Sequence, residues 1–290
     1  MESTEYLSTK VIQRSECMGK NVIVAWGVKS SQEEAETKII FHAVDAVSDG
    51  ATEITIHSPD TDVFVLSLRR YPQLCSDVRF VTGTGKRHRV INLKHVVQAL
   101  GSTKVAALPG LHALSGADIT GSFAGKGKAT WWKMFMKADE EKISALANLG
   151  TRGQPSADTL TGIEKVVSQV YAPNTVIDNV KKLRWWLFWK KQAQSENLPP
   201  TPEALWQAIN RANYQALVWN LDAVPEPQLP SPGTFGWKLE DDKWVSVMTS
   251  LPPAPEAIIQ LVKCGCIKTR CSTNRCNCWK AELKCTNLCS

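Results

Sequence analysis

Seven of the nine cysteines are crowded at the C-terminal end of the chain, at Cys264, Cys266, Cys271, Cys276, Cys278, Cys285 and Cys289. Four thiolates in a tetrahedron are the usual ligands of structural Zn²⁺. Because Cys-x-Cys pairs are cramped as ligands of one ion, we expect them to spread over neighbouring zinc ions that share a sulfur. The odd count, together with an N-terminus that lacks a secretory signal, favours metal over disulfides and an intracellular location.

A second set of residues suited to chemistry consists of acids placed where strands are expected to end or helices to begin: Glu34, Glu36, Asp60, Asp62 and Asp118. Mg²⁺ prefers oxygen ligands and keeps several waters beside a few carboxylates. Clustered acids of this kind can hold the ions that assist phosphodiester cleavage. The alternative is that each pair of acids lies in an ordinary solvated turn.

The first half of the chain alternates short apolar strands with amphipathic helices, which predicts an α/β layer architecture. We expect strands at 21–26, 53–57 and 78–82, a hairpin closed by 88–91, and helices at 33–47, 93–100 and 105–114, the last with a break at Pro109-Gly110. The apolar segment 63–70 could be either type. Since Asp60 and Asp62 follow a strand, we expect them at the carboxyl edge of the sheet, where open α/β folds usually place sites.

The second half is expected to be helical, with helices at 143–149, 159–171, 174–191 and 202–219. A cluster of prolines between Pro225 and Pro232 then predicts an extended connection, followed by a small hairpin around Trp237 and Trp244. The predicted organisation is an α/β region at 20–140, a helical extension at 141–222, a proline-rich linker with the hairpin at 223–262 and a zinc module at 263–290.

The order of the acidic motifs resembles the second half of a flap-endonuclease (PIN-like) nuclease domain over about residues 20 to 140. The motifs are Glu34-Ala-Glu36, Ser58-Pro-Asp-Thr-Asp62, Leu114-Ser-Gly-Ala-Asp118 and the glycine-rich run Gly121–Ala129. This resemblance implies a PIN-like parallel sheet, Mg²⁺ or Mn²⁺ held by the five acids, and metal-dependent cleavage of structured DNA. Lys126 and Lys128 would add charge where backbone amides approach a phosphate.

The chain departs from this family at its N-terminal side. There the family has a strand with another metal-binding aspartate, followed by a further acid. Only 33 residues precede Glu34, and the expected strand at 22–26 contains no acid. We therefore expect an N-terminally incomplete nuclease-like domain. The rival interpretation is a catalytically inactive DNA-binding or scaffold protein with a relic nuclease fold.

The cysteine spacing resembles the CXC module of tesmin/TSO1-like proteins, which bind DNA through residues between their cysteines. At the equivalent places this chain has Lys268, Arg270, Arg275 and Lys280. A structural zinc knot that serves protein contacts is the alternative. The combination of a nuclease-like half and a cysteine-rich tail also resembles a group of uncharacterised animal proteins of mobile-element type. The motifs that carry this resemblance are His57-Ser-Pro-Asp-Thr-Asp-Val-Phe-Val65, Leu108-Pro-Gly-Leu-His-Ala-Leu-Ser-Gly116 and Arg184-Trp-Trp-Leu187.

Composition agrees with a protein of two unequal parts. The 290 residues are 43% hydrophobic, enough for a substantial core, and contain no apolar run long enough to span a bilayer. The segment 263–290 contains six basic residues and one acid, which accounts for five of the six net positive charges. A small basic module favours DNA as the partner and the nucleus as the location, with protein partners as the alternative and no membrane partner.

Two further features have competing interpretations. The run Lys181–Lys191 combines basic residues with three tryptophans and could stack on bases or lie on a membrane, but at helical spacing Trp185 and Trp189 are expected to pack in the core. His57 and His112 lie near the acids in sequence and could line their site, although packing is the more common role for such histidines.

Overall fold

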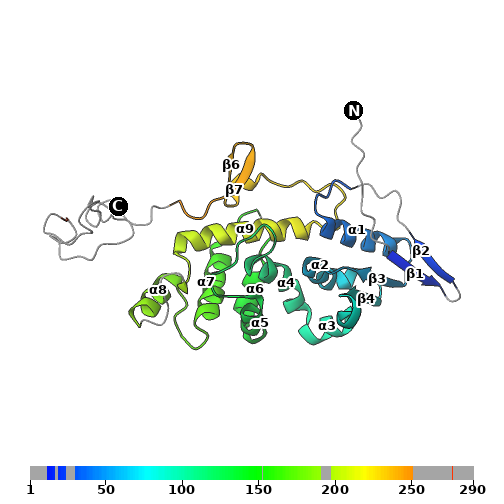
Figure 1. The fold of residues 1–290 in the computed structure, drawn as a ribbon, viewed down its shortest axis with the longest axis horizontal. Helices are drawn as coiled ribbons and strands as arrows, with labels where there is room; N and C mark the ends of the chain where they lie inside the picture. The colour runs from blue at the N-terminus through cyan, green and yellow to red at the C-terminus, as the bar shows by residue number, and fades with distance from the viewer. Residues whose placement is uncertain are drawn as a thin grey trace. The chain divides into compact units, whose positions relative to one another are not determined.

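The structure, a computed structural model, describes residues 30–151, 153–190 and 197–250, the backbone of 12–16 and 19–23, and Cys276. The chain divides into two compact units, Met1–Val247 and Met248–Ser290. All described helices and strands belong to the first unit (Figure 1). Of the predicted zinc ligands only Cys276 is described, and its side chain is buried. The other six cysteines, with Lys268, Arg270, Arg275 and Lys280, lie outside the described residues.

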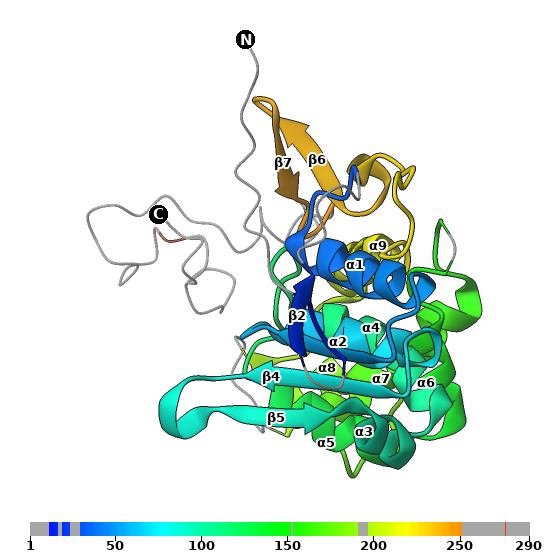
Figure 2. The same ribbon diagram turned by 90° about the vertical axis from the view of Figure 1, so that its right-hand side faces the viewer.

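The central sheet has three strands in the order β3 (Glu53–His57), β4 (Asp77–Thr82) and β5 (Arg89–Asn92). β3 and β4 are parallel, whereas β4 and β5 are antiparallel neighbours that Figure 2 shows side by side. The expected hairpin is therefore confirmed. The sheet as a whole is mixed, because the connection between β4 and β5 is too short for a parallel crossover. This small mixed sheet with helices is compatible with the α/β class.

The strand expected at 21–26 is observed over 21–23 as the end of β2 (Gly19–Ile23), and residues 24–26 lie outside the described residues. β2 pairs antiparallel with β1 (Ile12–Glu16) in a two-stranded sheet separate from the central one. β1 nevertheless lies beside β3. The N-terminal side of the fold is therefore an antiparallel strand pair.

Four helices belong with the central sheet: α1 (Ala35–Ser48), α2 (Thr61–Arg70), α3 (Leu93–Leu100) and α4 (Ser102–Leu114). The segment of uncertain type is helix α2, whose Val63 and Leu66 are fully buried. The break expected at Pro109 is wrong. A proline removes only one donor of the helix ladder, and α4 continues to Leu114 with every residue from Ala107 onward buried in the core.

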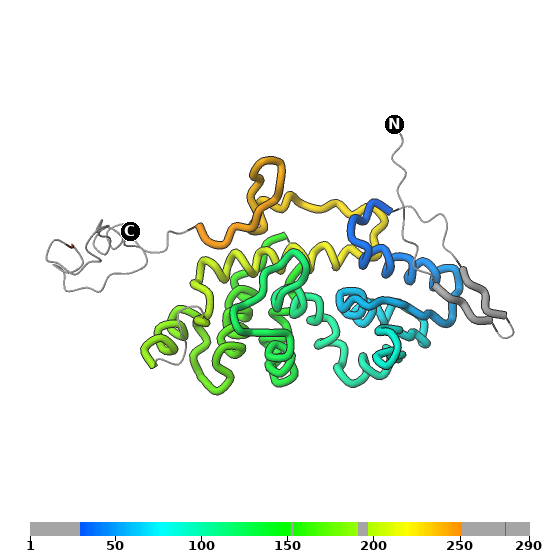
Figure 3. The backbone as a smooth tube through the Cα atoms, in the orientation of Figure 1, coloured from blue at the N-terminus to red at the C-terminus, as the bar shows by residue number. Residues whose placement is uncertain are grey.

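The remaining helices are α5 (Lys128–Lys137), α6 (Glu140–Ala147), α7 (Ala157–Tyr171), α8 (Val180–Trp189) and α9 (Pro202–Asn220). Figure 3 traces α9 along the other helices, where it contacts both α4 and α7. One hydrophobic core runs from the sheet into this half and includes Ile54, Leu114, Val166 and Trp219. The predicted α/β region and helical extension therefore share a single core.

The predicted hairpin near the linker is confirmed as β6 (Trp237–Glu240) paired with β7 (Lys243–Ser246). Short 3₁₀ turns occur at η1 (Tyr71–Gln73), η2 (Gly85–Arg87) and η4 (Pro232–Thr234). Within the described ranges, no helix has both the length and the apolar character needed to cross a bilayer.

Helix α8 contradicts the expectation that its tryptophans pack in the core. Trp185 and Trp189 are each 68% exposed. The buried stripe of this helix consists instead of Val180, Leu183 and Leu187, which repeat at helical spacing on the side that packs against α7. A ten-residue helix buries only one such stripe, and here aliphatic side chains occupy it.

Candidate functional site

The first part of the site is the N-terminus of α2, directly after β3. The Asp60 side chain caps this helix by accepting a hydrogen bond from the Asp62 backbone N–H at 2.9 Å, and the Asp60 N–H donates to the Ser58 hydroxyl at 3.1 Å. Aspartate is among the best residues for an N-cap. The Ser-Pro-Asp-Thr-Asp sequence therefore both ends the strand and positions the two carboxylates, as the sequence predicted.

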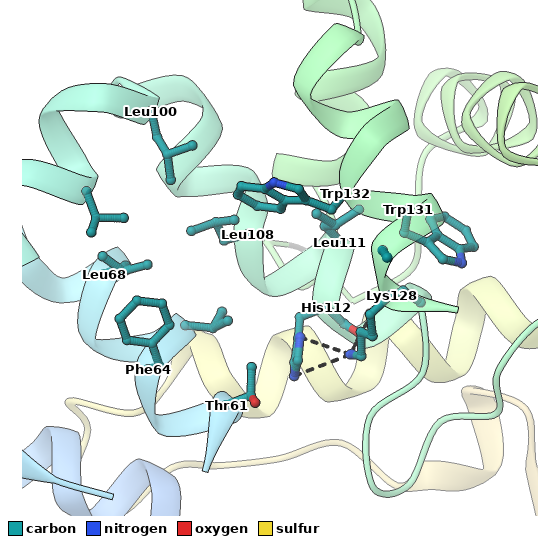
Figure 4. Close-up of a pocket in the computed structure, with 14 residues that line it drawn as sticks. Thr61, Phe64, Leu68, Leu100, Leu108, Leu111, His112, Lys128, Trp131 and Trp132 are labelled. Atoms are coloured by element: carbon teal, nitrogen blue, oxygen red, sulfur yellow. Dashed lines mark hydrogen bonds between the residues drawn. The ribbon is translucent and has the colours of Figure 1, made fainter. Parts of the chain in front are cut away.

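A histidine connects Asp62 to a lysine. His112 of α4 is buried and places its Nε2 2.6 Å from the Asp62 Oδ1. Its Nδ1 lies 2.9 Å from the Lys128 Nζ, which also donates to the His112 carbonyl at 3.2 Å (Figure 4). With a protonated Lys128 donating to Nδ1, the imidazole proton belongs on Nε2 and is donated to Asp62. Three helices, α2, α4 and α5, are joined at this histidine.

Electrostatics show that the acids share one neighbourhood. Burial raises the pKa of Glu36, and repulsion from Asp60, Asp62 and Asp118 raises it further. Burial lowers the pKa of Lys128 to about 8, while Asp62 and Asp118 oppose that decrease. Asp62 and Asp118 therefore both act electrostatically on Glu36 and on Lys128.

Asp118 is exposed on the turn that follows α4. Thr120 fixes this turn: its hydroxyl donates to the Ala113 carbonyl at 2.6 Å and accepts from the Ala117 N–H at 2.7 Å. Gly116 begins the turn at φ 107°, a conformation that favours glycine. The Gly-Ala-Asp motif therefore directs an acid to the end of α4 at which His112 also lies.

Glu34 is hydrogen-bonded to α9, and it also lies within the electrostatic influence of Glu36 and Asp62. Its carboxylate accepts hydrogen bonds from Gln215 Nε2 at 2.9 Å and from Trp219 Nε1 at 3.0 Å. Burial raises the pKa of Glu34, an effect that these two hydrogen bonds oppose. The Trp219 ring also packs against the His112 ring, with 5.8 Å between centroids. Glu34 therefore serves to anchor α1 to α9, and Trp219 connects that anchor to His112.

These carboxylates are near one another without forming a closed ligand set. Within the described ranges, no three or more histidine, cysteine, aspartate or glutamate side chains form a group that could hold a metal ion. Their chemistry still suits a hard divalent cation, since Glu36, Asp60, Asp62 and Asp118 offer only oxygen donors and the three aspartates repel Glu36. Of these four acids Asp118 is the one whose side chain is exposed.

A cavity of about 520 Å³ opens beside the His112–Lys128 pair (Figure 4). Its walls are mainly aliphatic and aromatic side chains of α2, α3, α4 and α5, including Phe64, Leu108 and Trp132. His112 and Lys128 supply polar atoms at one end. The cavity therefore places an apolar surface directly next to the charged cluster.

The two lysines of the glycine-rich run have different surroundings. Lys128 begins α5 and directs its ammonium group to His112. Lys126 places its Nζ 4.7 Å from the centre of the Tyr171 ring, a cation–π contact, and burial lowers its pKa. Lys128 therefore belongs to the acidic neighbourhood, whereas Lys126 is directed toward α7.

Several participants were missed or left undecided by sequence reasoning. His112 is the one strongly polar side chain in the buried stretch Ala107–Leu114 of α4. A lone histidine in an apolar helical segment could therefore have marked it as a site residue. Gln215 and Trp219 had no local signal, because they bond to Glu34 across 181 and 185 residues of sequence.

No protein-family model, no curated protein and no solved structure matches this chain. The likenesses to flap-endonuclease-type nucleases and to CXC modules therefore remain predictions from the motifs.

Proposed function

We propose that the first unit is a metal-dependent nuclease-like domain that cleaves structured DNA, and that the C-terminal module binds zinc and DNA. The protein would then act on nucleic acid in the nucleus. The observation that supports the proposal is the turn after β3, where Asp60 caps α2 and Asp62 is hydrogen-bonded to His112 of α4, together with the repulsion that Asp60, Asp62 and Asp118 exert on Glu36. A divalent cation bound among these acids would offset the repulsion that the three aspartates exert on Glu36.

Each residue of the cluster has a definable task in this proposal. Asp60, Asp62, Asp118 and Glu36 would hold Mg²⁺ or Mn²⁺, an ion that supplies Lewis acidity at a phosphodiester. His112 orients the Asp62 carboxylate through its 2.6 Å hydrogen bond. Lys128 adds a positive charge at the edge of the cluster, where a phosphate of the substrate would approach.

The test is cleavage of flap and hairpin DNA in the presence of Mg²⁺ or Mn²⁺. We expect the variant with both Asp60→Asn and Asp62→Asn to lose at least about 100-fold in rate, because it loses two negative ligand groups. Asparagine also caps helices and can accept a hydrogen bond, so the fold should persist, as circular dichroism would verify. Asp77→Asn, which changes a carboxylate on β4, is the matched control. No cleavage by the unchanged chain, or equal cleavage by the double variant, would refute the enzyme.

A non-catalytic DNA-binding or scaffold protein is the second candidate. The observation in its favour is that several acids already have structural roles: Glu34 anchors α9, Asp60 caps α2 and Asp62 bonds to His112. In that case Mg²⁺ would bind weakly and the double variant would bind DNA as well as the unchanged chain does. Measuring Mn²⁺ affinity by isothermal titration calorimetry separates these two candidates.

The zinc proposal rests on the cysteine spacing and on the six basic residues of segment 263–290. We expect a chain with Cys271→Ser and Cys276→Ser to lose most of its zinc, because serine does not supply the thiolates that a Zn²⁺ tetrahedron requires. Retention on duplex DNA should fall in the same variant. Elemental analysis and a filter-binding assay give the two results. Cys75→Ser, which alters a cysteine on the first unit, is the control.

Zinc that stays bound in the double variant would refute the ligand assignment. Unchanged DNA retention after zinc loss would instead restrict the module to protein contacts. Retention mediated by phosphate contacts should also weaken steeply between about 50 and 200 mM salt.

A further inference from the structure

Helix α8 presents three large aromatic side chains to solvent on one side. Trp185, Phe188 and Trp189 are 68%, 59% and 68% exposed. Phe188 and Trp189 follow Trp185 by three and four residues, which places the three side chains on one face of the helix. The opposite side of α8 is fixed in the core by Val180, Leu183 and Leu187. The aromatic face is therefore held rigidly outward.

Positive charge flanks this aromatic face at its N-terminal end. Exposed Lys181 and Lys182 precede it by one helical turn, and exposed Lys190 follows it. Lys190 also places its Nζ 4.8 Å from the centre of the Trp186 ring. The run from Lys181 to Lys191 contains five basic residues and no acidic residue. A partner that covers these rings must therefore carry negative charge.

Planar aromatic rings combined with flanking lysines match the chemistry of a single nucleic-acid strand. Bases stack on exposed tryptophan and phenylalanine irrespective of sequence, while lysines contact the phosphates between them. A helix that lies on a bilayer inserts its whole apolar face, aliphatic residues included, into the boundary between headgroups and acyl chains. In contrast, α8 has ten residues and its aliphatic stripe is already buried in the core.

We propose that the face of α8 formed by Trp185, Phe188 and Trp189, with Lys181 and Lys182 beside it, binds single-stranded nucleic acid. This deepens the proposed function, on which it rests for the class of partner, by naming an unpaired strand as part of the substrate. Two or three bases would stack on the rings, and the neighbouring phosphates would contact the lysines. Helix α8, which contributes no acid to the cluster, would thus hold a single-stranded arm of the substrate.

The test measures binding of the full chain to a fluorescein-labelled oligo-dT, without added divalent cation so that no cleavage occurs. Fluorescence anisotropy gives the dissociation constant. We expect Trp185→Ala with Trp189→Ala to weaken binding at least about tenfold, since each lost ring removes a stacking contact. Trp185→Phe with Trp189→Phe should stay within about threefold, because phenylalanine also stacks. Trp244→Ala, on the β6–β7 hairpin, is the matched control for loss of an exposed tryptophan.

The zinc module is a second expected site of DNA binding in the same chain, so the measurement is repeated with Cys271→Ser and Cys276→Ser in the background. A tenfold loss that persists there supports the proposal. Equal affinity of the alanine variant and the unchanged chain overturns it. Alanine substitutions that abolish binding to vesicles with anionic phospholipid, or that abolish self-association in light scattering, while leaving oligo-dT affinity unchanged also overturn it. Because the assay contains no cleavage step, failure of the nuclease proposal leaves its result interpretable.

Discussion

Replacing Asp222 with alanine is expected to lower the free energy of unfolding by about 3–5 kcal/mol. The Asp222 side chain is fully buried after the end of α9. Its Oδ1 accepts from Arg70 Nε at 2.5 Å and lies 3.7 Å from Arg69 Nη1. Burial raises the pKa of Asp222 and both arginines oppose that increase. Removing the carboxylate leaves the partly buried Arg70 without its counter-charge, which is the costly case for a buried pair.

Urea unfolding followed by circular dichroism measures this effect. Asp222→Asn should fall between the alanine variant and the unchanged chain, because its carbonyl oxygen still accepts from Arg70 but carries no charge. Asp77→Ala removes the exposed ion pair between Asp77 and Arg79 and is expected to cause no measurable change. If Asp222→Ala unfolds at the same urea concentration as Asp77→Ala, the pair does not join α9 to α2 as described.

The second large effect is expected at Gly110, where α4 and α6 approach closely. A Cβ atom added here would lie 2.1 Å from the Leu146 backbone oxygen and 3.3 Å from the Leu149 Cβ. The first of these contacts is with backbone, which has no rotamer to change. Gly110→Ala must therefore separate the two helices and should lower the free energy of unfolding by about 2–3 kcal/mol. Thermal unfolding measures the loss.

Gly110→Ala should also reduce DNA cleavage beyond its effect on stability, because His112 follows two residues later on the displaced helix. Gly121→Ala is the matched control, since its added Cβ would have no neighbour within 4 Å. It should unfold like the unchanged chain. A Gly110 variant with unchanged stability would mean that α4 and α6 are not packed this tightly in solution.

Much of the fold on which the site depends was predictable because its signals are local. The alternating strand before Ser58 and the capping residue Asp60 lie within a few positions of one another, so the Asp60–Asp62 turn was placed correctly. The hairpin formed by β4 and β5 and the helix observed as α9 were also predicted from local signals. In each case neighbouring residues determine the element.

The errors arise where packing between segments that are distant in sequence determines the structure. Pro109 was expected to break a helix, but core packing of its neighbours outweighs the lost hydrogen bond. Trp185 was expected in the core because aromatic residues are usually buried. Which side of α8 is buried depends instead on how this helix packs against α7. The contribution of Trp219 to the site had no sequence signal, since only the folded chain brings it to Glu34 and His112.

The hydrogen bonds from α9 to Glu34 also bear on the order in which the molecule is made. Gln215 and Trp219 reach the carboxylate of a residue synthesised 181 and 185 positions earlier. During translation Glu34 must remain hydrated until α9 leaves the ribosome, and such distant pairings form slowly. The anchor between Glu34 and α9 would therefore form late, after the sheet. A nascent chain stalled before α9 would lack both hydrogen bonds to Glu34 and the packing of Trp219 against His112.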